Sequence, residues 1–126
     1  ALAEYMHKQI RMELGIAAGD AREKRKLFQQ GYRGSRYSFG YPACPDHTQK
    51  NIIWDLLNVE KNTGIILTES LAMWPASSVS GWYFAHPDSY YLGVNNIGRD
   101  QMEDYAKRRG ISTAEAERWL APILDR

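Results

Sequence analysis

Residues 65–94 read IILTESLAMWPASSVSGWYFAHPDSYYLGV, and this stretch decides the fold class. It contains three segments rich in β-branched and aromatic residues, at positions 65–68, 79–85 and 90–94. The sequence His-Pro-Asp-Ser between the last two segments is typical of a turn. We therefore predict three strands, of which the last two form an antiparallel hairpin.

Helical patterns flank this stretch on both sides. Before it, helices are predicted up to Gly15, over residues 20–30 and over residues 46–64. After it, two short helices are predicted over residues 100–109 and 112–120. Because the strands are grouped between helices instead of alternating with them, the predicted class is α+β, with an antiparallel or mixed sheet and flanking helices.

The first predicted helix has one apolar stripe, which we expect to face the core because its residues recur at a spacing of four. These residues are Leu2, Met6, Ile10 and Leu14. The helical pattern is already present at the first residues, without a start methionine or a capping residue, so we expect a fragment of a longer protein. A chain of 126 residues suits a single domain spanning residues 1–126.

Composition narrows the classes of partner. Sixteen basic against fifteen acidic residues leave a net charge of +1, which does not favour binding to nucleic acid or to a membrane surface. No apolar run approaches the roughly 20 residues that a membrane span needs. The one cysteine excludes an internal disulfide framework, so a cytoplasmic setting is expected.

The Cys44-x-x-His47 spacing suggests a metal site or an activated thiol, and neither interpretation is favoured. A structural zinc site needs four ligands, and His7 and His86 lie far away in sequence without partner spacing of their own. A thiol between two prolines is equally consistent with buried packing. We predict neither a metal ligand nor a catalytic residue here.

The loop of residues 36–47, RYSFGYPACPDH, is the strongest candidate for ligand binding. Arg33 and Arg36 lie among aromatic residues, and three nearby glycines permit close approach of the backbone to another body. An arginine fork binds carboxylates, and aromatic rings offer a flat apolar surface to a base or a cation. An amino-acid nucleotide conjugate would use all of these features. A surface loop held by aromatic packing remains the alternative.

Three long strings carry a resemblance to a known family: RGSRYSFGYPACPDHTQK, LTESLAMWPASSVSGWYFAHPDSYY and IGRDQMEDYAKRRGISTAEAERWLAPIL. Together they resemble the C-terminal S-adenosylmethionine-binding reactivation, or activation, domain of cobalamin-dependent methionine synthase. The resemblance implies the C-terminal part of that domain's fold. It also implies S-adenosylmethionine and cobalamin as cofactors, with cobalamin held by a separate domain.

The family is a methyltransferase that moves a methyl group to homocysteine in methionine biosynthesis. Its reactivation domain supports the reductive remethylation of cob(II)alamin to methylcobalamin, with an electron from flavodoxin or a flavoprotein reductase. By resemblance, the partners are the cobalamin-binding domain and that electron donor, and the isolated chain is a binding module without turnover. The alternative is a non-catalytic docking module for a corrinoid protein or flavodoxin.

The family's Arg-x-x-x-Gly-Tyr-Pro pattern falls on residues 36–42. By resemblance, Arg36 pairs with the methionyl carboxylate, and Ser38 and Gly40 offer main-chain groups to the adenosyl part. Tyr41 would face the corrin of cobalamin.

Two further ligand positions depart from the family pattern. The family's tyrosine pair after the hairpin turn falls on Tyr91 and Leu92, of which only Tyr91 matches. Gln30 stands where the family carries a glutamate, so it can keep a hydrogen bond but adds no charge near the sulfonium. The family domain also begins upstream of Ala1 and takes an acidic ligand contact from that part.

Overall fold

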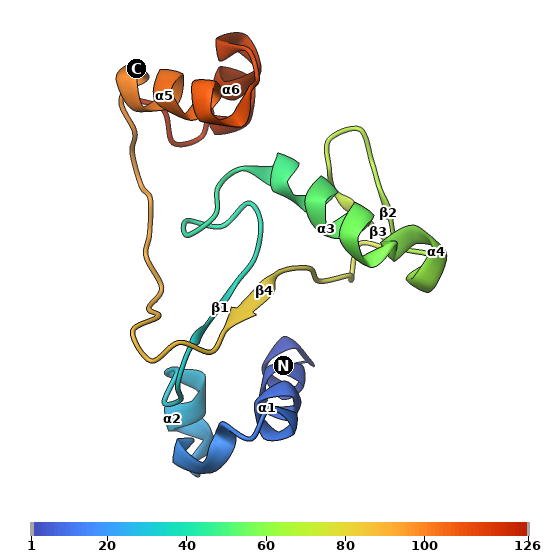
Figure 1. Ribbon diagram of the computed structural model, residues 1–126, viewed down its shortest axis with the longest axis vertical. Coiled ribbons are helices and arrows are strands. Elements are labelled where there is room, and N and C mark those ends of the chain that lie inside the picture. Colours follow the sequence, from blue (N-terminus) through green and yellow to red (C-terminus); the bar gives the residue numbers. More distant parts are fainter. Residues whose placement is uncertain (1, 126) are drawn as a thin grey trace. The chain divides into compact units, whose positions relative to one another are not determined.

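The computed structural model describes residues 2–125, which fold into short helices and two small antiparallel ribbons (Figure 1). The chain divides into two compact units. Unit 1 consists of Ala1–Tyr37 and Gly81–Tyr91, and unit 2 of Ser38–Ser80 and Leu92–Arg126. Both ribbons are antiparallel and lie between helices in the sequence, so the predicted α+β class is confirmed.

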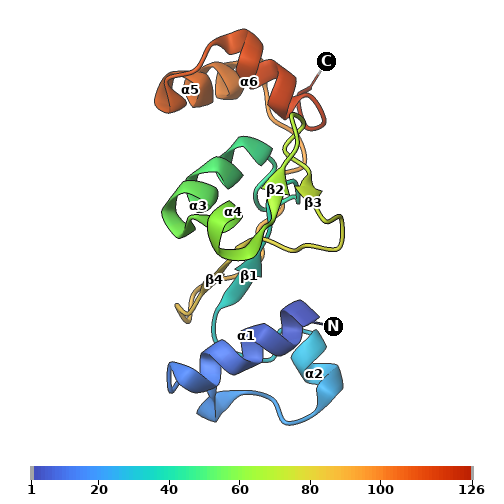
Figure 2. The same cartoon turned by 90° about the vertical axis from the view of Figure 1, so that its right-hand side faces the viewer.

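Unit 1 is built on a two-stranded ribbon and two helices. The strands are β1 (Ser35–Tyr37) and β4 (Trp82–Phe84), with Arg36 opposite Tyr83. The helices are α1 (Leu2–Glu13) and α2 (Lys24–Phe28), which lie side by side in both views (Figures 1 and 2). The backbone before β1 needs a glycine, since a Cβ on Gly34 would lie 1.9 Å from the carbonyl oxygen of Phe84.

Helix α1 forms where it was predicted, but it presents the opposite face to the interior. His7 and Arg11 are 1% and 2% exposed, whereas Leu2 and Leu14 are 71% and 62% exposed. The expected core-facing stripe of apolar residues is therefore wrong. The buried polar residues contact charged and aromatic partners from other parts of unit 1, which the periodicity of α1 alone does not reveal.

The second helix is shorter than predicted, because it begins at Lys24 and not after Asp20. Asp20 does not cap it: its carboxylate forms an ion pair with Arg11. Gln30 has a left-handed backbone (φ 59°) and lies beyond the end of the helix.

The third predicted helix lies in unit 2, and the structure divides it. Asp46 accepts a hydrogen bond from the Thr48 amide (2.7 Å) at the start of a 3-10 turn (His47–Gln49), which leads into α3 (Lys50–Leu57). Asn58 adopts a left-handed conformation (φ 48°) and separates α3 from α4 (Val59–Thr63). Asparagine tolerates this conformation better than most residues, so the chain bends without a glycine.

The second ribbon and the last two helices complete unit 2. Strands β2 (Ile66–Leu67) and β3 (Met73–Trp74) pair with each other, and β3 was not predicted. Helices α5 (Arg99–Arg109) and α6 (Thr113–Leu120) pack together, as Figure 2 shows. Their shared core consists of Met102, Ala106, Ala116 and Leu120. Both helices agree with the predicted bounds to within one residue.

The predicted hairpin of residues 79–85 and 90–94 is wrong. The turn itself exists, with the Ser89 amide donating to the carbonyl of His86 (3.1 Å), but residues 90–94 are not a strand. Strand β4 pairs instead with β1, which lies in the segment predicted to be an irregular loop. The Tyr90 carbonyl accepts a hydrogen bond from the Tyr37 hydroxyl (2.7 Å). This segment is therefore held by a side-chain hydrogen bond and not by the backbone hydrogen bonds of a strand pair. Among the described helices, none is long and apolar enough to cross a membrane.

Candidate functional site

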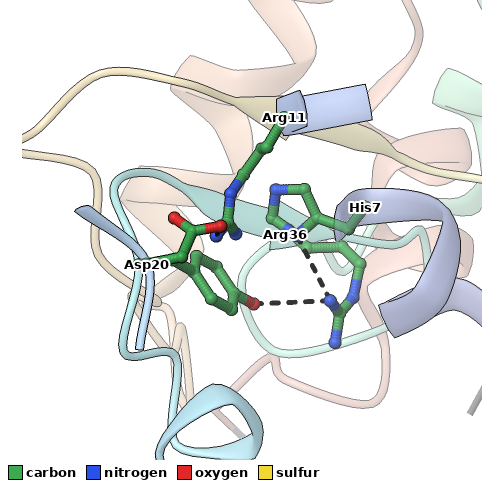
Figure 3. Close-up of polar contacts among 5 residues, drawn as sticks. His7, Arg11, Asp20 and Arg36 are labelled. Carbon is green, nitrogen blue, oxygen red and sulfur yellow. Dashed lines mark hydrogen bonds and ion pairs between the residues drawn. The ribbon is translucent and has the colours of Figure 1, made fainter. Parts of the chain in front are cut away.

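Arg36 is the centre of a polar cluster in unit 1 (Figure 3). Its Nη2 forms an ion pair with Glu4 Oε2 at 2.9 Å. Its Nη1 lies 3.3 Å from His7 Nδ1 and 3.4 Å from the Tyr32 hydroxyl, to which it donates. Strand β1 positions this arginine and α1 supplies both Glu4 and His7. We call Glu4, His7, Arg11, Asp20, Tyr32 and Arg36 the Arg36 cluster.

His7 is a neutral member of this cluster. Its ring stacks on Tyr83 with centroids 4.4 Å apart and meets Tyr32 edge-on at 4.8 Å. Burial lowers the pKa of His7 to about 4, with Arg11 and Arg36 acting in the same direction. A guanidinium has no acceptor, so His7 Nδ1 accepts from Arg36 and its proton is carried by Nε2. The neutral imidazole thus accepts a hydrogen bond from Arg36 and forms no ion pair with Glu4, so Glu4 stays paired with Arg36.

A second ion pair fixes the far side of the cluster. Arg11 pairs with Asp20, and both side chains are almost fully buried. The Arg11 guanidinium also lies 3.8 Å from the centroid of the Tyr32 ring, in a cation–π contact. Two arginines and two carboxylates balance within the cluster. Burial is the largest single influence on Arg36 and alone would lower its pKa, but the hydrogen bond to Glu4 and the charges of Tyr32, Glu4 and Tyr83 together raise that pKa.

An aromatic surface follows the same ribbon. Tyr37 stacks on Tyr91 with centroids 5.9 Å apart and an interplanar angle of 11°. Trp82 and Phe84 lie 6.1 and 5.4 Å from the Tyr37 ring. Tyr91 and Phe84 are exposed, so this aromatic surface offers flat apolar area to a planar ligand.

Three of the predicted ligand residues, Arg36, Tyr91 and Gln30, belong to unit 1. Arg36 is partly exposed and Tyr91 is exposed beside Tyr37. Gln30 is exposed at a tight turn, where its carbonyl accepts from the Tyr32 amide (2.7 Å). Among the described residues, the Gln30 side chain forms no hydrogen bond with Arg36.

The remaining predicted residues, Ser38, Gly40, Tyr41 and Leu92, belong to unit 2. The Gly40 amide donates to the carbonyl of Cys44 (2.8 Å), and the Cys44 amide donates back to the carbonyl of Tyr41 (2.8 Å). These bonds close a tight turn over Gly40–Cys44, on which the Tyr41 side chain is exposed. Leu92 is exposed as well. The ligand roles of all seven residues stay a prediction.

A pocket of about 250 Å³ lies beside this turn, within unit 2. Its walls combine the turn residues Gly40 and Tyr41 with His47, with Val94 from the segment before α5, and with Trp119 from α6. The Val94 amide donates to the carbonyl of Pro42 (2.7 Å) and ties the two walls together. The pocket is mainly apolar, and a histidine is among its few polar groups.

Cys44 and His47 do not form a metal centre or a catalytic pair in this structure. The Cys44 thiol is buried and donates to Gln49 Oε1 at 3.8 Å. Burial raises its pKa to about 11, so it stays a protonated, poorly nucleophilic thiol at neutral pH. His47 Nδ1 lies 2.9 Å from the ammonium of Lys50. Across residues 2–125, no three potential metal ligands of the His, Cys, Asp and Glu types come together.

Sequence reasoning missed the partners of Arg36. Glu4, His7 and Arg11 recur at spacings of three and four, which is the pattern of one helix face. That polar stripe is visible in the sequence, but the apolar stripe beside it is stronger and predicts that the opposite face of the helix is buried. Asp20 and Tyr32 carry no comparable signal, since they reach the cluster through the turns around α2.

The ribbon of unit 1, with its partly exposed arginine and its aromatic surface, has the features of an α+β module of the small-ligand-binding class. The sequence model of the family described as "Vitamin B12 dependent methionine synthase, activation domain" matches residues 1–110, so the chain belongs to that family. A similar solved structure is the crystal structure of the MetH reactivation domain bound to AdoHcy, at 55% identity and a TM-score of 0.89. The alignment covers 99% of this chain and 39% of that one, so this chain spans well under half of that relative's length. The predicted family resemblance is confirmed.

Proposed function

We propose that this chain binds S-adenosylmethionine and supports the reductive remethylation of cob(II)alamin to methylcobalamin in a cobalamin-dependent methionine synthase. The observation that carries the proposal is the 55% identity to a reactivation domain that was crystallised with AdoHcy. S-adenosylmethionine differs from that molecule by one methyl group on sulfur, which is the group to be transferred. The expected surroundings are cytoplasmic.

Arg36 is the proposed partner of the methionyl carboxylate. Its guanidinium carries five N–H donors, and the structure accounts for contacts of Nη1 and Nη2. Glu4 already occupies one edge, so the ligand carboxylate must share the guanidinium with Glu4 or displace it. Either route makes binding weaker than for an unpaired arginine, because one charge-assisted bond is exchanged for another.

The other predicted residues would hold the rest of the ligand. The backbone of Ser38 and Gly40 would contact the adenosyl group, and Tyr91 with the aromatic surface would stack on the adenine ring. Gln30 would offer an amide near the sulfonium, and Leu92 an apolar contact. Tyr41 is exposed, as a residue that faces the corrin of a cobalamin held by another domain must be.

The chemistry requires two inputs that this chain does not itself contain. One electron would come from flavodoxin or a flavoprotein reductase, and the methyl group would come from bound S-adenosylmethionine, which leaves as S-adenosylhomocysteine. A cobalamin held by a separate domain would supply the metal centre that accepts both. The chain's own task is to bind the methyl donor and to orient its methyl group, so the isolated chain is proposed to bind without turnover.

Calorimetric titration with S-adenosylmethionine tests the proposal. Arg36→Ala should weaken binding by about 1.5–3 kcal/mol, since it removes a charged partner of a carboxylate. Arg33→Ala is the matched control, because Arg33 lies three residues away and donates to the backbone carbonyl of Ala85 (2.7 Å) instead. The control should bind like the parent chain.

The same titration is to be run on this chain and on a version extended upstream, because the resemblance implies one acidic ligand contact from that part. An absence of saturable heat from the extended version would refute the binding proposal. Equal losses from Arg36→Ala and Arg33→Ala would instead refute the role assigned to Arg36.

The second candidate is a non-catalytic docking module for a corrinoid protein or for flavodoxin. The ion pair between Arg36 and Glu4 favours it, since the arginine already has a carboxylate partner in the chain. Capture of flavodoxin or a corrinoid protein that is indifferent to S-adenosylmethionine would support docking. Association that depends on S-adenosylmethionine would support the first proposal.

A further inference from the structure

A buried lysine contacts His47, one of the residues that line the pocket of unit 2. Lys50 is 4% exposed, and within residues 2–125 it forms no ion pair with a carboxylate. Its ammonium lies 2.9 Å from His47 Nδ1 and donates to the carbonyl of Leu71 at 2.5 Å. A buried charge without a counter-ion is costly, so both of these acceptors contribute to holding it.

The contact with Lys50 determines where His47 carries its proton. An ammonium has three donors and no acceptor, so Nδ1 must be the unprotonated, accepting nitrogen and Nε2 must carry the hydrogen. The other charge near the ring is Asp46, whose oxygens already accept from Thr48 and from the Tyr105 hydroxyl. Burial, then Lys50, lower the pKa of His47, while Asp46 acts in the opposite direction.

The protonated nitrogen lies against Gly40, and His47 and Gly40 are both lining residues of the pocket. The ring edge with Cε1 and Nε2 lies against Gly40, where a Cβ would come within 2.1 Å of Cε1 and 2.3 Å of Nε2. In the part of the chain that the structure describes, Nε2 has no hydrogen-bond partner. One uncharged N–H donor is thus available in a mainly apolar pocket.

We propose that Lys50 is a positioning residue that holds His47 in its Nε2–H form, and that this N–H binds a carboxamide or similar neutral oxygen of a flat ligand in the pocket. The apolar walls from Tyr41, Val94 and Trp119 suit the body of such a ligand. The inference rests on the proposed function in one respect only, which is the choice of a carboxamide. The amide side chains of cobalamin are hydrogen-bond acceptors of this class.

Nitrogen NMR on the full chain, with labelled histidine, reads the protonation of each ring nitrogen directly. His47 should appear as the single Nε2–H form in the parent chain and in Lys50→Arg. Lys50→Met should give a mixture of both forms at His47. The chain provides two internal references, because His7 Nδ1 accepts from Arg36 and His86 Nδ1 accepts from the Asp88 amide (3.2 Å). Their signals should not change.

Titration with benzamide, a flat ring with one carboxamide, tests the ligand class. The His47 Nε2–H and the Trp119 indole signals should both shift, and Lys50→Met should weaken binding about five- to ten-fold relative to Lys50→Arg. A protonated Nδ1 in the parent chain, or an unchanged His47 spectrum in Lys50→Met, overturns the role of Lys50. The parent spectrum decides this even when Lys50→Met does not fold.

A failure of benzamide to shift either signal overturns the ligand half of the proposal. None of these readouts involves S-adenosylmethionine, so a failure here is distinguishable from a failure of the proposed function. Conversely, normal benzamide binding by a chain that ignores S-adenosylmethionine would leave the pocket intact and refute only the proposed function.

Discussion

Gly40 shows how one missing side chain shapes the ligand loop. Its backbone is left-handed (φ 78°), and the place of its Cβ is taken by the His47 ring, which Lys50 holds from the other side. We expect Gly40→Ala to lower the free energy of unfolding by about 2–5 kcal/mol, from the left-handed backbone and the overlap together. Urea denaturation measures this change.

Gly110 provides the matched control for that substitution. It is also left-handed (φ 68°), but a Cβ there would meet nothing within 4 Å. Gly110→Ala should therefore cost only about 1–2 kcal/mol, the backbone contribution alone. Equal losses at the two positions would mean that the His47 ring moves aside. The missing side chain of Gly40 would then not be required for the contact between residue 40 and that ring.

His7 makes the stability of the chain depend on pH. Its pKa is about 4 in the folded chain, against 6.5 in the unfolded chain, so the unfolded chain binds an extra proton between these values. The free energy of unfolding should fall as the pH drops from 6.5 to 4, by at most about 3 kcal/mol.

The variant His7→Phe should have a flatter pH profile between 4 and 6.5, because it keeps a ring against Tyr83 but cannot titrate. His86 is exposed, and His86→Phe is the control that should keep the parent's slope. Thermal unfolding at several pH values gives both profiles. An unchanged slope in His7→Phe would show that the carboxylates alone produce the pH dependence.

Among the elements, α6 depends on a single capping contact at its start. The Ser112 hydroxyl accepts a hydrogen bond from the Glu115 amide (3.2 Å), one of the otherwise unpaired donors at the helix start. Ser112→Ala should lower the free energy of unfolding by about 1 kcal/mol. Ser77→Ala is the control, since Ser77 is exposed and forms no hydrogen bond in the described structure. A control loss as large as that of Ser112→Ala would contradict the capping role.

The elements that were predicted well are those whose signals are local. Helices α5 and α6 have capping residues, a left-handed Gly110 between them and apolar residues at helical spacing, all within about 25 residues. The β1 to β4 ribbon has no local signal, because Arg36 and Tyr83 are 47 positions apart and no turn joins the strands. A turn at residues 86–89 therefore suggested the wrong partner for β4.

The residues of the candidate site differ in the same way, because some have local sequence signals and others do not. Arg36 and Gly40 are predicted as ligand residues because their motif is contiguous in the sequence, and the turn over Gly40–Cys44 is local as well. Glu4 and Lys50 were not found, because each acts on a residue that only the folded chain brings near. Charged residues on a helix are normally solvent-facing, so burial of His7 and Arg11 is not an inference that composition supports.

For the molecule as a whole, the division into two units makes the prediction of a single domain testable. Met102 is fully buried between α5 and α6, so Met102→Ala should cost about 2–5 kcal/mol in unit 2. If residues 1–126 unfold as one domain, amide hydrogen exchange in β1 of unit 1 should accelerate as much as in α6. Acceleration confined to unit 2 would identify two independently stable domains.

The outward apolar stripe of α1 determines how this chain behaves when it is concentrated. Leu2, Met6 and Leu14 are exposed, and a net charge of +1 provides little repulsion between copies. Light scattering should therefore detect reversible clusters that grow with concentration and with added ammonium sulfate. The pair Met6→Glu and Leu14→Glu should disperse them, whereas Lys8→Glu on the same helix should not. Solubility, and not only stability, thus depends on which side of α1 is turned inward.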